Sequence, residues 1–434
     1  MKKLKTKYYF PMLIAIILLY AVLYFLFIRP LFYSQEYQTK EWITDLTRHI
    51  LLGVNDPSQF EKINRVYRFL SFWYCYSFMH TQKYTVWVLF NLQNKFTNII
   101  MLNVYAYDIM DNIVIKEQVP LNMHDLKIVE TNANVFMIQL GNEYRQVIDF
   151  TKNTSTLSIE TNKIKYMLDI DIDDYTTNQC SFLPRYQLLG NIVNVEGNVT
   201  GTPGDWMSDN PFIGKIRGGS LNYDKIESGG NIWFDNFIGC NNYFLGPYTW
   251  FVVLNDDWLI YLLWFDVYDK RDNIGTVKPI LIKDRKRDKV LFAGTPGIDC
   301  KKAGFPLNHL NYLMEPFTMT YQTNKKMGEE EYDDYRVMFD SKELKIEITS
   351  IPGRCRKVFD YDYYKNDVAD DMQMEPWDKE YYKLISNLRY VEYLSLVNVT
   401  LHYHGEEQQF QARQVIDSMY PKNSLIPTEI RWMK

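Results

Sequence analysis

The chain has 434 residues, of which 47% are hydrophobic and 23% are charged, and its formal net charge is −5 at pH 7. This length exceeds one ordinary domain and predicts two globular units. The slightly acidic balance gives no reason to expect nucleic-acid binding, which usually requires a basic face. Aromatic residues make up 16% of the chain, and 34 tyrosines against 20 glycines favour β-rich structure.

The N-terminus contains a long apolar segment. Residues 8–28 read YYFPMLIAIILLYAVLYFLFI, with no charged residue and one proline near the start. As a helix this segment is about 30 Å long, which matches the hydrocarbon core of a bilayer. A cleaved signal peptide is a competing interpretation, but Arg29 and Pro30 follow where small residues are expected. A buried core helix is the other alternative. We therefore predict a transmembrane signal anchor that attaches the chain to a lipid bilayer.

The charges that flank this segment predict its orientation. Four lysines precede it, whereas only Arg29 closely follows it; the four are Lys2, Lys3, Lys5 and Lys7. The positive-inside rule then keeps residues 1–7 in the cytosol and sends the rest of the chain across the membrane. We expect a type II single-pass protein whose C-terminal domains are lumenal, extracellular or on a viral or cell envelope surface.

Two weaker features agree with this orientation. Sequons for N-glycosylation begin at Asn153, Asn198 and Asn398, and they predict a glycoprotein. The five cysteines are widely spread, and one or two disulfides are compatible with them outside the cytosol. No spacing of Cys or His indicates zinc. Nothing in the sequence identifies a protein partner.

The chain after the apolar segment predicts a mostly β fold. Residues 29–69 indicate a helical or irregular connector. Short runs rich in β-branched and aromatic residues follow, including YTVWVLFNL, NIIMLNVYAY and IKYMLDIDI, and Asn, Asp, Gly and Lys separate them. The spacing is typical of an antiparallel sandwich or barrel. No strand–helix–strand alternation occurs, which argues against a Rossmann-type fold.

A change of pattern predicts where the β structure divides. Charges concentrate over residues 271–289, which we interpret as a linker or hairpin. The first β domain is then predicted at 70–270 and the second at 290–425, with a tail at 426–434. The basic cluster from Lys283 to Lys289 within this linker is either a solvated hairpin tip or a contact for anionic lipid.

Common catalytic signatures are absent from the sequence. It contains no P-loop, GxSxG, HExxH or GxGxxG motif, and its six histidines are scattered. His402 and His404 lie on the same side of a predicted strand, and we interpret them as exposed-face residues in preference to a metal site. The acidic stretch at residues 328–335 indicates a solvated loop or the start of a strand. Any chemistry is therefore expected to use carboxylates and aromatic rings without a bound cofactor or metal.

Three segments in order resemble the AttH-like family, which includes carotenoid 1,2-hydratase (hydroxyneurosporene synthase). SFWYCYSFMHTQKYTVWVLFNL resembles the opening strands of that family. GGNIWFDNFIG, followed by GPYTWFVVLNDDWLIYLLWF, is similar to its Trp-Phe-Asp segment and the strands after it. LRYVEYLSLVNVTLHYHGEEQQFQARQVIDSMY is similar to its closing strands. The resemblance extends from Phe72 to Tyr420.

The resemblance implies two tandem lipocalin-like antiparallel β-barrels, a fold wide enough to hold one small apolar ligand. In the hydratase branch, an Asp of the Trp-Phe-Asp motif is the acid that protonates an isoprenoid double bond. Asp235 matches that position, and Trp233 and Trp250 match the aromatic residues that stabilise the cation. Trp73, Phe237 and Tyr248 are the candidate ligand contacts by the same resemblance. A carboxyl group buried among rings keeps its proton near neutral pH, which suits an acid.

The sequence also departs from the family pattern. Asn236-Phe237-Ile238-Gly239 follows the candidate acid, where the family usually has polar or His residues and then Trp-Gly. The later Trp-Asp-Trp element reads Tyr248-Thr249-Trp250, without its acid. A capping role for Asp235 in a strand-end turn is therefore the alternative to catalysis. Two functions remain open. One is a membrane-anchored protein that binds a hydrophobic small molecule, and the other is a cofactor-free hydratase, isomerase or cyclase that uses Asp235 as general acid.

Overall fold

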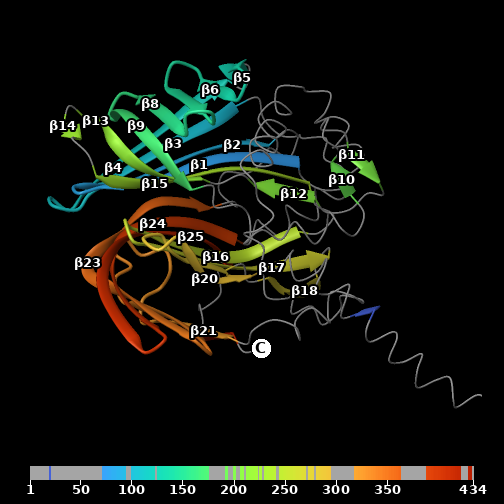
Figure 1. Cartoon of the computed structure of the whole chain (residues 1–434), viewed down its shortest axis with the longest axis vertical. Helices are drawn as coiled ribbons and strands as arrows, with labels where there is room; N and C mark the ends of the chain where they lie inside the picture. The colour runs from blue at the N-terminus through green and yellow to red at the C-terminus, as the bar shows by residue number, and fades with distance from the viewer. Residues whose placement is uncertain are drawn as a thin grey trace, which may run out of the picture.

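The computed structural model is built almost wholly from β-strands (Figure 1). It describes residues 19–20, 71–93, 99–122, 125–174, 191–193, 199–201, 206–209, 212–222, 224–226, 229–240, 244–269, 272–277, 280–294, 317–362, 388–421 and 429–432. At some strand ends only the backbone is described. The mostly β fold that the sequence predicts is confirmed for this part of the chain.

The first sheet is antiparallel and contains the strands drawn blue to green in Figure 1. Its hydrogen-bonded order is β4-β3-β2-β1-β15-β13-β9-β8-β7-β6-β5, while β12 pairs with β15 and β14 pairs with β13. These strands are β1 Ser71–Thr81, β2 Tyr84–Gln93, β3 Ile99–Asp108, β4 Ile113–Asn122, β5 Leu126–Asn132, β6 Val135–Leu140, β7 Tyr144–Asp149, β8 Thr154–Glu160, β9 Lys165–Asp174, β12 Trp206–Asp209, β13 Phe212–Leu221, β14 Asp224–Ile226 and β15 Gly230–Cys240. A separate pair joins β10 Asn191–Val193 to β11 Val199–Gly201.

The second sheet contains the strands drawn yellow-green to red, and it faces the first (Figure 1). Its order is β20-β19-β17-β16-β25-β24-β23-β22-β21-β26, and β18 pairs with β17. These strands are β16 Phe244–Leu254, β17 Trp258–Asp269, β18 Asp272–Val277, β19 Ile280–Asp284, β20 Lys289–Gly294, β21 Phe317–Thr323, β22 Tyr335–Ser341, β23 Leu344–Asp362, β24 Leu388–Tyr403, β25 Glu406–Pro421 and β26 Glu429–Trp432. The two barrel-like sheets correspond to the two β units that the resemblance implies.

The chain passes from the first sheet to the second earlier than the sequence predicts. Residues 244–269, which we assigned to the first domain, form β16 and β17 of the second sheet. The segment 271–289 is not a linker between sheets, because it supplies β18 and β19 and the turn that follows them. The basic cluster there is a hairpin turn in which buried Lys283 pairs with Asp288 at 2.7 Å. The physical reason is that residues 250–254 of β16 and 258–262 of β17 are apolar on both faces, so the sequence shows no break between them and the preceding strands.

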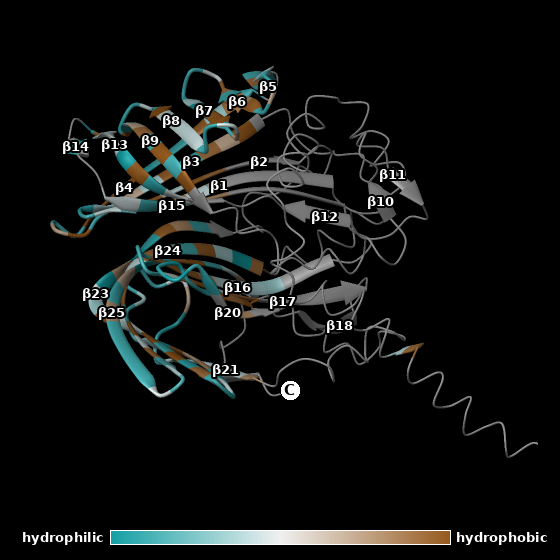
Figure 2. Ribbon diagram, in the orientation of Figure 1, coloured by the Kyte–Doolittle hydropathy of each residue, from teal (hydrophilic) through white to brown (hydrophobic). Residues whose placement is uncertain are grey.

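Strand alternation divides the buried residues into three cores. In β2, Val86 and Val88 face a core enclosed by the first sheet, whereas Trp87 between them faces the second sheet. In β16, Phe251 and Val253 likewise face a core enclosed by the second sheet. Brown and teal segments alternate along several strands in Figure 2. The third core fills the space between the two sheets, and we call it the junction.

Polar contacts at its edge also hold the junction together. Arg354 of β23 donates to the carbonyl of Ile109, in the turn between β3 and β4. In the same turn, Asn112 Oδ1 accepts a 3.1 Å hydrogen bond from Arg356 Nε. At another point, Asn231 Nδ2 of β15 donates to Asp256 Oδ1 at 2.9 Å. Charge-assisted hydrogen bonds of this kind are the stronger ones and fix the relative position of the two sheets.

The predicted membrane anchor lies outside the described residues, except for Leu19 and Tyr20, which are helical. Within the part of the chain that the structure describes, no helix has the length and apolar character needed to cross a membrane.

Candidate functional site

Two carboxyl groups lie opposite each other on the junction face of the second sheet. The β24–β25 hairpin turns at His404 and Gly405, and its register pairs Glu392 directly with Asp417. Glu392 has no exposed surface and Asp417 is 9% exposed. Directly paired residues share a face of the sheet and have neighbouring side chains. The hairpin therefore buries two acids side by side.

The same register places aromatic residues on both sides of the acid pair. Trp250 of β16 pairs with Asp417, and Phe359 of β23 pairs with Glu392. The four residues form one row across four neighbouring strands. Leu394 and Val415, which also face the junction, continue the face away from this row. Each acid therefore has the other acid on one side in the row and an aromatic residue on the other side.

A tyrosine hydroxyl contacts each acid. Tyr248 donates a 2.8 Å hydrogen bond to Asp417 Oδ1, and Tyr390 donates one to Glu392 Oε1. The two tyrosine rings lie 6.3 Å apart. The second oxygen of Glu392 accepts no hydrogen bond of ordinary geometry from the described residues. The Trp87 indole nevertheless lies close enough to favour the ionised form of this carboxyl.

The first sheet covers the pair with two further rings. The Trp87 ring lies 5.7 Å from that of Trp250, and the Tyr105 ring lies 5.9 Å from that of Phe359. Tyr105 is buried, and its hydroxyl accepts a 3.3 Å hydrogen bond from Gln118 Nε2. Burial and the negative charge of Glu392 both raise the pKa of Tyr105, so it stays a neutral phenol. Residues from both sheets thus complete the surroundings of the acids.

The electrostatics of the pair follow from this enclosure. Burial and, next to it, the charge of Asp417 raise the pKa of Glu392 to about 8, against the opposing effects of Tyr390 and Trp87. Burial also raises the pKa of Asp417 to about 7, although the tyrosine hydroxyls favour its ionised form. No cation among the described residues acts on either pKa. The pair therefore retains protons near neutral pH, when exposed carboxyls are ionised.

Two of the predicted site residues come together beside this pair. The rings of Trp233 and Trp250 each lie 5.6 Å from that of Tyr261, and both residues belong to the junction core. Both tryptophans therefore face the junction and not the core enclosed by the first sheet. Trp250 belongs to the second sheet, and strand alternation turns Trp233 away from the first core while Phe234 faces it. Tyr248, a predicted ligand contact, is the partner of Asp417.

For the other predicted site residues, the structure describes the backbone but not the side chains. The backbone of Asp235 lies in β15, opposite Tyr76 of β1. The side chains of Asp235, Trp73 and Phe237 are not among those described. The role of Asp235 as an acid or as a turn cap therefore stays a prediction.

Sequence reasoning missed Glu392 and Asp417 as a pair. The signal was nevertheless present, because the hairpin turn at His404 and Gly405 fixes the register of the two long strands. Counting equally back and forward from that turn places these two acids opposite each other, each among apolar neighbours.

No cluster of metal-ligating side chains occurs among the described residues. His402 and His404, which we predicted to be exposed, have side chains that are 48% and 55% exposed. They contact Glu407 and Glu343 respectively, at 3.5 and 3.7 Å.

No protein-family model and no curated protein sequence matches the chain. Several solved structures resemble it. A structure of CghA with Sch210972 is 8% identical, with 82% of this chain and 89% of that chain covered and a TM-score of 0.48. Kievitone hydratase from Nectria haematococca is 10% identical over 80% and 88% of the two chains, with a TM-score of 0.42. A putative AttH from Nitrosomonas europaea is 12% identical over 82% and 93%, with a TM-score of 0.41. One of these solved structures is thus described as an AttH, the family that the sequence motifs resemble.

The raised pKa values predict how stability depends on pH. Between about pH 4, near the ordinary pKa of carboxyls, and pH 8, the folded pair binds more protons than the unfolded chain does. The contribution of the pair to the free energy of unfolding therefore falls as the pH rises through this window, by at most about 1.4 kcal/mol per pH unit for each extra proton. We expect Glu392→Gln to flatten this dependence in urea titrations, and Glu407→Gln, on the exposed hairpin, to leave it unchanged.

The difference between variant and wild type is the quantity to compare, because another buried group acts in the opposite direction. Burial, assisted by Arg413, lowers the pKa of His80 to about 3, so its contribution to stability rises with pH up to about 6.5. Identical pH profiles for wild type and Glu392→Gln would contradict the raised pKa of the pair.

Proposed function

We propose that the junction between the two sheets binds a hydrophobic small molecule, with the Glu392–Asp417 pair at the polar end of the site. The observation that carries this proposal is a pair of acids with raised pKa values, enclosed by aromatic residues from two sheets. Ligand sites in proteins are mostly apolar with a few convergent polar groups, and they often lie between structural units. Groups with perturbed pKa values also concentrate at functional sites.

A second function, acid catalysis, is favoured by the protonation state of the pair. An acid with a pKa near the working pH both holds its proton and gives it up readily. In the proposed reaction, one carboxyl protonates a carbon–carbon double bond of the ligand, and a carbocation forms as the acid becomes ionised. The rings of Trp87, Trp250 and Phe359 would stabilise the positive charge by about 0.5–2 kcal/mol each.

The carbocation can then follow either of two balanced routes. In hydration, the oxygen of a water molecule adds to the cation, and the carboxylate takes the proton that this water loses. In isomerisation, the carboxylate removes a proton from a carbon next to the cation. In cyclisation, a second double bond of the same molecule attacks the cation, and the carboxylate then removes a proton from a carbon next to the new cation. The acid is regenerated in the routes that end by proton loss. None of these steps requires a cofactor.

The binding proposal is tested by mass spectrometry of small molecules that copurify with the full-length chain. We expect an apolar molecule with wild type and its loss in Trp250→Ala, because this ring belongs to the row that contains the acids and lies 5.7 Å from the Trp87 ring that covers them. The matched control is Phe136→Ala, which removes a buried ring from the first core. Both changes cost about 3–5 kcal/mol of stability, so retention in the control separates loss of the site from loss of stability. Equal retention in all three proteins would contradict a site at the junction.

The catalytic proposal is tested with amide variants of three acids. If the pair supplies the proton, turnover of the copurified molecule is lost in Glu392→Gln or Asp417→Asn, and Asp235→Asn remains active. An amide keeps the shape of a carboxyl but cannot protonate a carbon. If Asp235→Asn alone abolishes turnover, the acid is Asp235, as the family resemblance implies. Full activity in all three variants would exclude these carboxyls as the acid.

We further propose that residues 8–28 anchor the chain in a membrane and that the two sheets lie on the non-cytosolic side. The uncharged segment and the four lysines before it support this proposal. Asn153 lies in the turn before β8 and Asn398 is exposed on β24, so both positions suit glycan attachment. In intact vesicles with a cytosolic exterior, we expect added protease to leave the C-terminal part uncut. Cleavage of that part without detergent would reverse the predicted orientation.

A further inference from the structure

A second group of buried polar residues lies inside the second sheet, on the face away from the junction. We call Tyr332, Tyr335, Cys355, Ser395 and Gln414 the Gln414 cluster. All five are at most 3% exposed. Alternation along β25 directs Gln414 into the second core with Ile416, whereas Val415 faces the junction. The Gln414 cluster is therefore separate from the acid pair.

The hydrogen bonds in this cluster converge on one end of the Gln414 amide. Gln414 Oε1 accepts from the Tyr335 hydroxyl and, at 3.1 Å, from Ser395 Oγ. The two hydroxyls are themselves 3.2 Å apart. Gln414 Nε2 has no hydrogen-bond partner among the described residues. Exchanging the amide oxygen and nitrogen changes only which end lacks a partner, because both hydroxyls can donate or accept.

The first sheet contains a matched arrangement that is complete. Tyr144 donates to Gln146 Oε1 at 2.7 Å, and Gln146 Nε2 donates to Ser155 Oγ at 3.3 Å. A tyrosine, a glutamine and a serine are again buried together, but here both ends of the amide are used. A buried glutamine in this fold can therefore be satisfied by the protein alone. The unmet end of Gln414 is a particular feature of the second sheet.

A second unmet group belongs to the same cluster. The Tyr332 hydroxyl is buried without a hydrogen-bond partner among the described residues, and its ring stacks on that of Tyr335 at 5.5 Å. Burial raises the pKa of Tyr332 well above its ordinary value, so it remains a neutral hydrogen-bonding group. Burial likewise raises the pKa of the Cys355 thiol. No member of the Gln414 cluster is charged at neutral pH.

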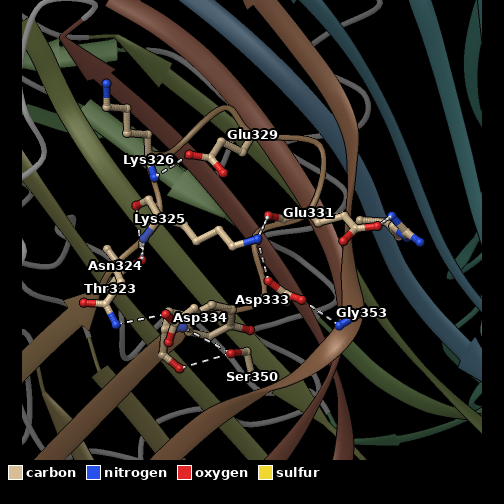
Figure 3. Close-up of polar contacts among 12 residues, drawn as sticks. Thr323, Asn324, Lys325, Lys326, Glu329, Glu331, Asp333, Asp334, Ser350 and Gly353 are labelled. Carbon is tan, nitrogen blue, oxygen red and sulfur yellow. Dashed lines mark hydrogen bonds and ion pairs between the residues drawn. The ribbon is translucent and has the colours of Figure 1, made fainter.

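The segment that carries Tyr332 is held in place from outside. Asp333 pairs with Lys325 at 2.9 Å and accepts a 2.7 Å hydrogen bond from the backbone of Gly353 (Figure 3). Asn324 Nδ2 also donates to Asp334 Oδ2, at 2.9 Å. The Gly353 amide and Lys325 keep the pKa of Asp333 below its ordinary value, so these contacts persist at neutral pH. The acidic stretch, predicted as a solvated loop or the start of a strand, is a loop that leads into β22 at Tyr335, and its Tyr332 is directed inward.

We propose that the second sheet encloses a binding site for a small neutral molecule that hydrogen-bonds to Gln414 and Tyr332. Buried polar groups in folded proteins almost always have partners, and two unmet groups in one cluster require an explanation. The surroundings specify the class of ligand. Phe251 lies 5.6 Å from Tyr321 and 6.2 Å from Tyr335, so aromatic rings adjoin the unmet groups. A phenol or a comparable small aromatic alcohol combines a hydroxyl that can hydrogen-bond to these groups with a ring that can pack against the neighbouring aromatic side chains.

The probe for this proposal is 4-fluorophenol, followed by fluorine NMR with the full-length chain. We expect saturable binding to wild type and about tenfold weaker binding to Gln414→Leu, the effect of losing roughly one hydrogen bond in a buried site. Gln146→Leu is the matched control and should bind as wild type does. Tyr332→Phe, which keeps the ring and removes only the hydroxyl, should also weaken binding and serves if Gln414→Leu does not fold.

Any of four outcomes would overturn the proposal. The first is no saturable binding to wild type. The second is equal affinity for wild type, Gln414→Leu and Tyr332→Phe. The third is a loss of binding in Trp250→Ala with Gln414→Leu unaffected, which would place the probe at the junction. The fourth outcome comes from a crystal structure with the probe. Ordered water alone at Gln414 and Tyr332 would also contradict a ligand site.

Discussion

An ionised carboxylate leaves water only at a cost of several kcal/mol, and two neighbouring carboxylates repel each other as well. The two sheets of this protein pack together over two neighbouring carboxyl groups, those of Glu392 and Asp417. No lysine or arginine among the described residues compensates the charges, so the pair is tolerated because it retains protons. The tyrosine hydroxyls of Tyr248 and Tyr390 orient the two carboxyls without neutralising them. Protonation of the pair and packing of the sheets are therefore linked.

This linkage means that the raised pKa values of the two acids depend on both sheets. The hairpin of β24 and β25 fixes the spacing of the acids, but Trp87 and Tyr105 of the first sheet complete their enclosure. Separation of the sheets would admit water and return both pKa values toward their ordinary range. The contacts of Arg354 and Arg356 with the β3–β4 turn hold the sheets at the distance that excludes water. A ligand that enters the junction must meet the same requirement, since it replaces water beside the acids.

The sequence predicts the class of fold better than the division of the chain. Short runs rich in β-branched and aromatic residues, such as the one that contains Val86-Trp87-Val88, identify strands, and these strands are confirmed. Residues 250–254 and 258–262 are apolar on both faces, since one face meets the second core and the other meets the junction. Alternation is lost in such strands, and the partner sheet cannot be deduced from them. The charged segment near Lys283 indicated a boundary between the domains, but charged residues are also common in hairpin turns.

The candidate site shows the same limit. Trp233 and Trp250 are conspicuous in the sequence, and the structure brings both against Tyr261. Which face of the first sheet Trp233 occupies depends on sheet packing, which sequence motifs do not specify. Glu392 and Asp417 are inconspicuous because single acids in long strands usually face solvent. Only the hairpin register brings them together, and only the packing of the other sheet buries them.

The most direct test of this account is infrared spectroscopy of the carboxyl groups in the full-length protein during a pH titration. Protonated carboxyls absorb separately from carboxylates, and Glu392→Gln and Asp417→Asn assign the bands. We predict a protonated carboxyl that persists at pH 7, disappears above about pH 8 and is absent from the variant with both substitutions, as the raised pKa values require. Complete ionisation of both groups by about pH 5, as for exposed carboxyls, would contradict the account.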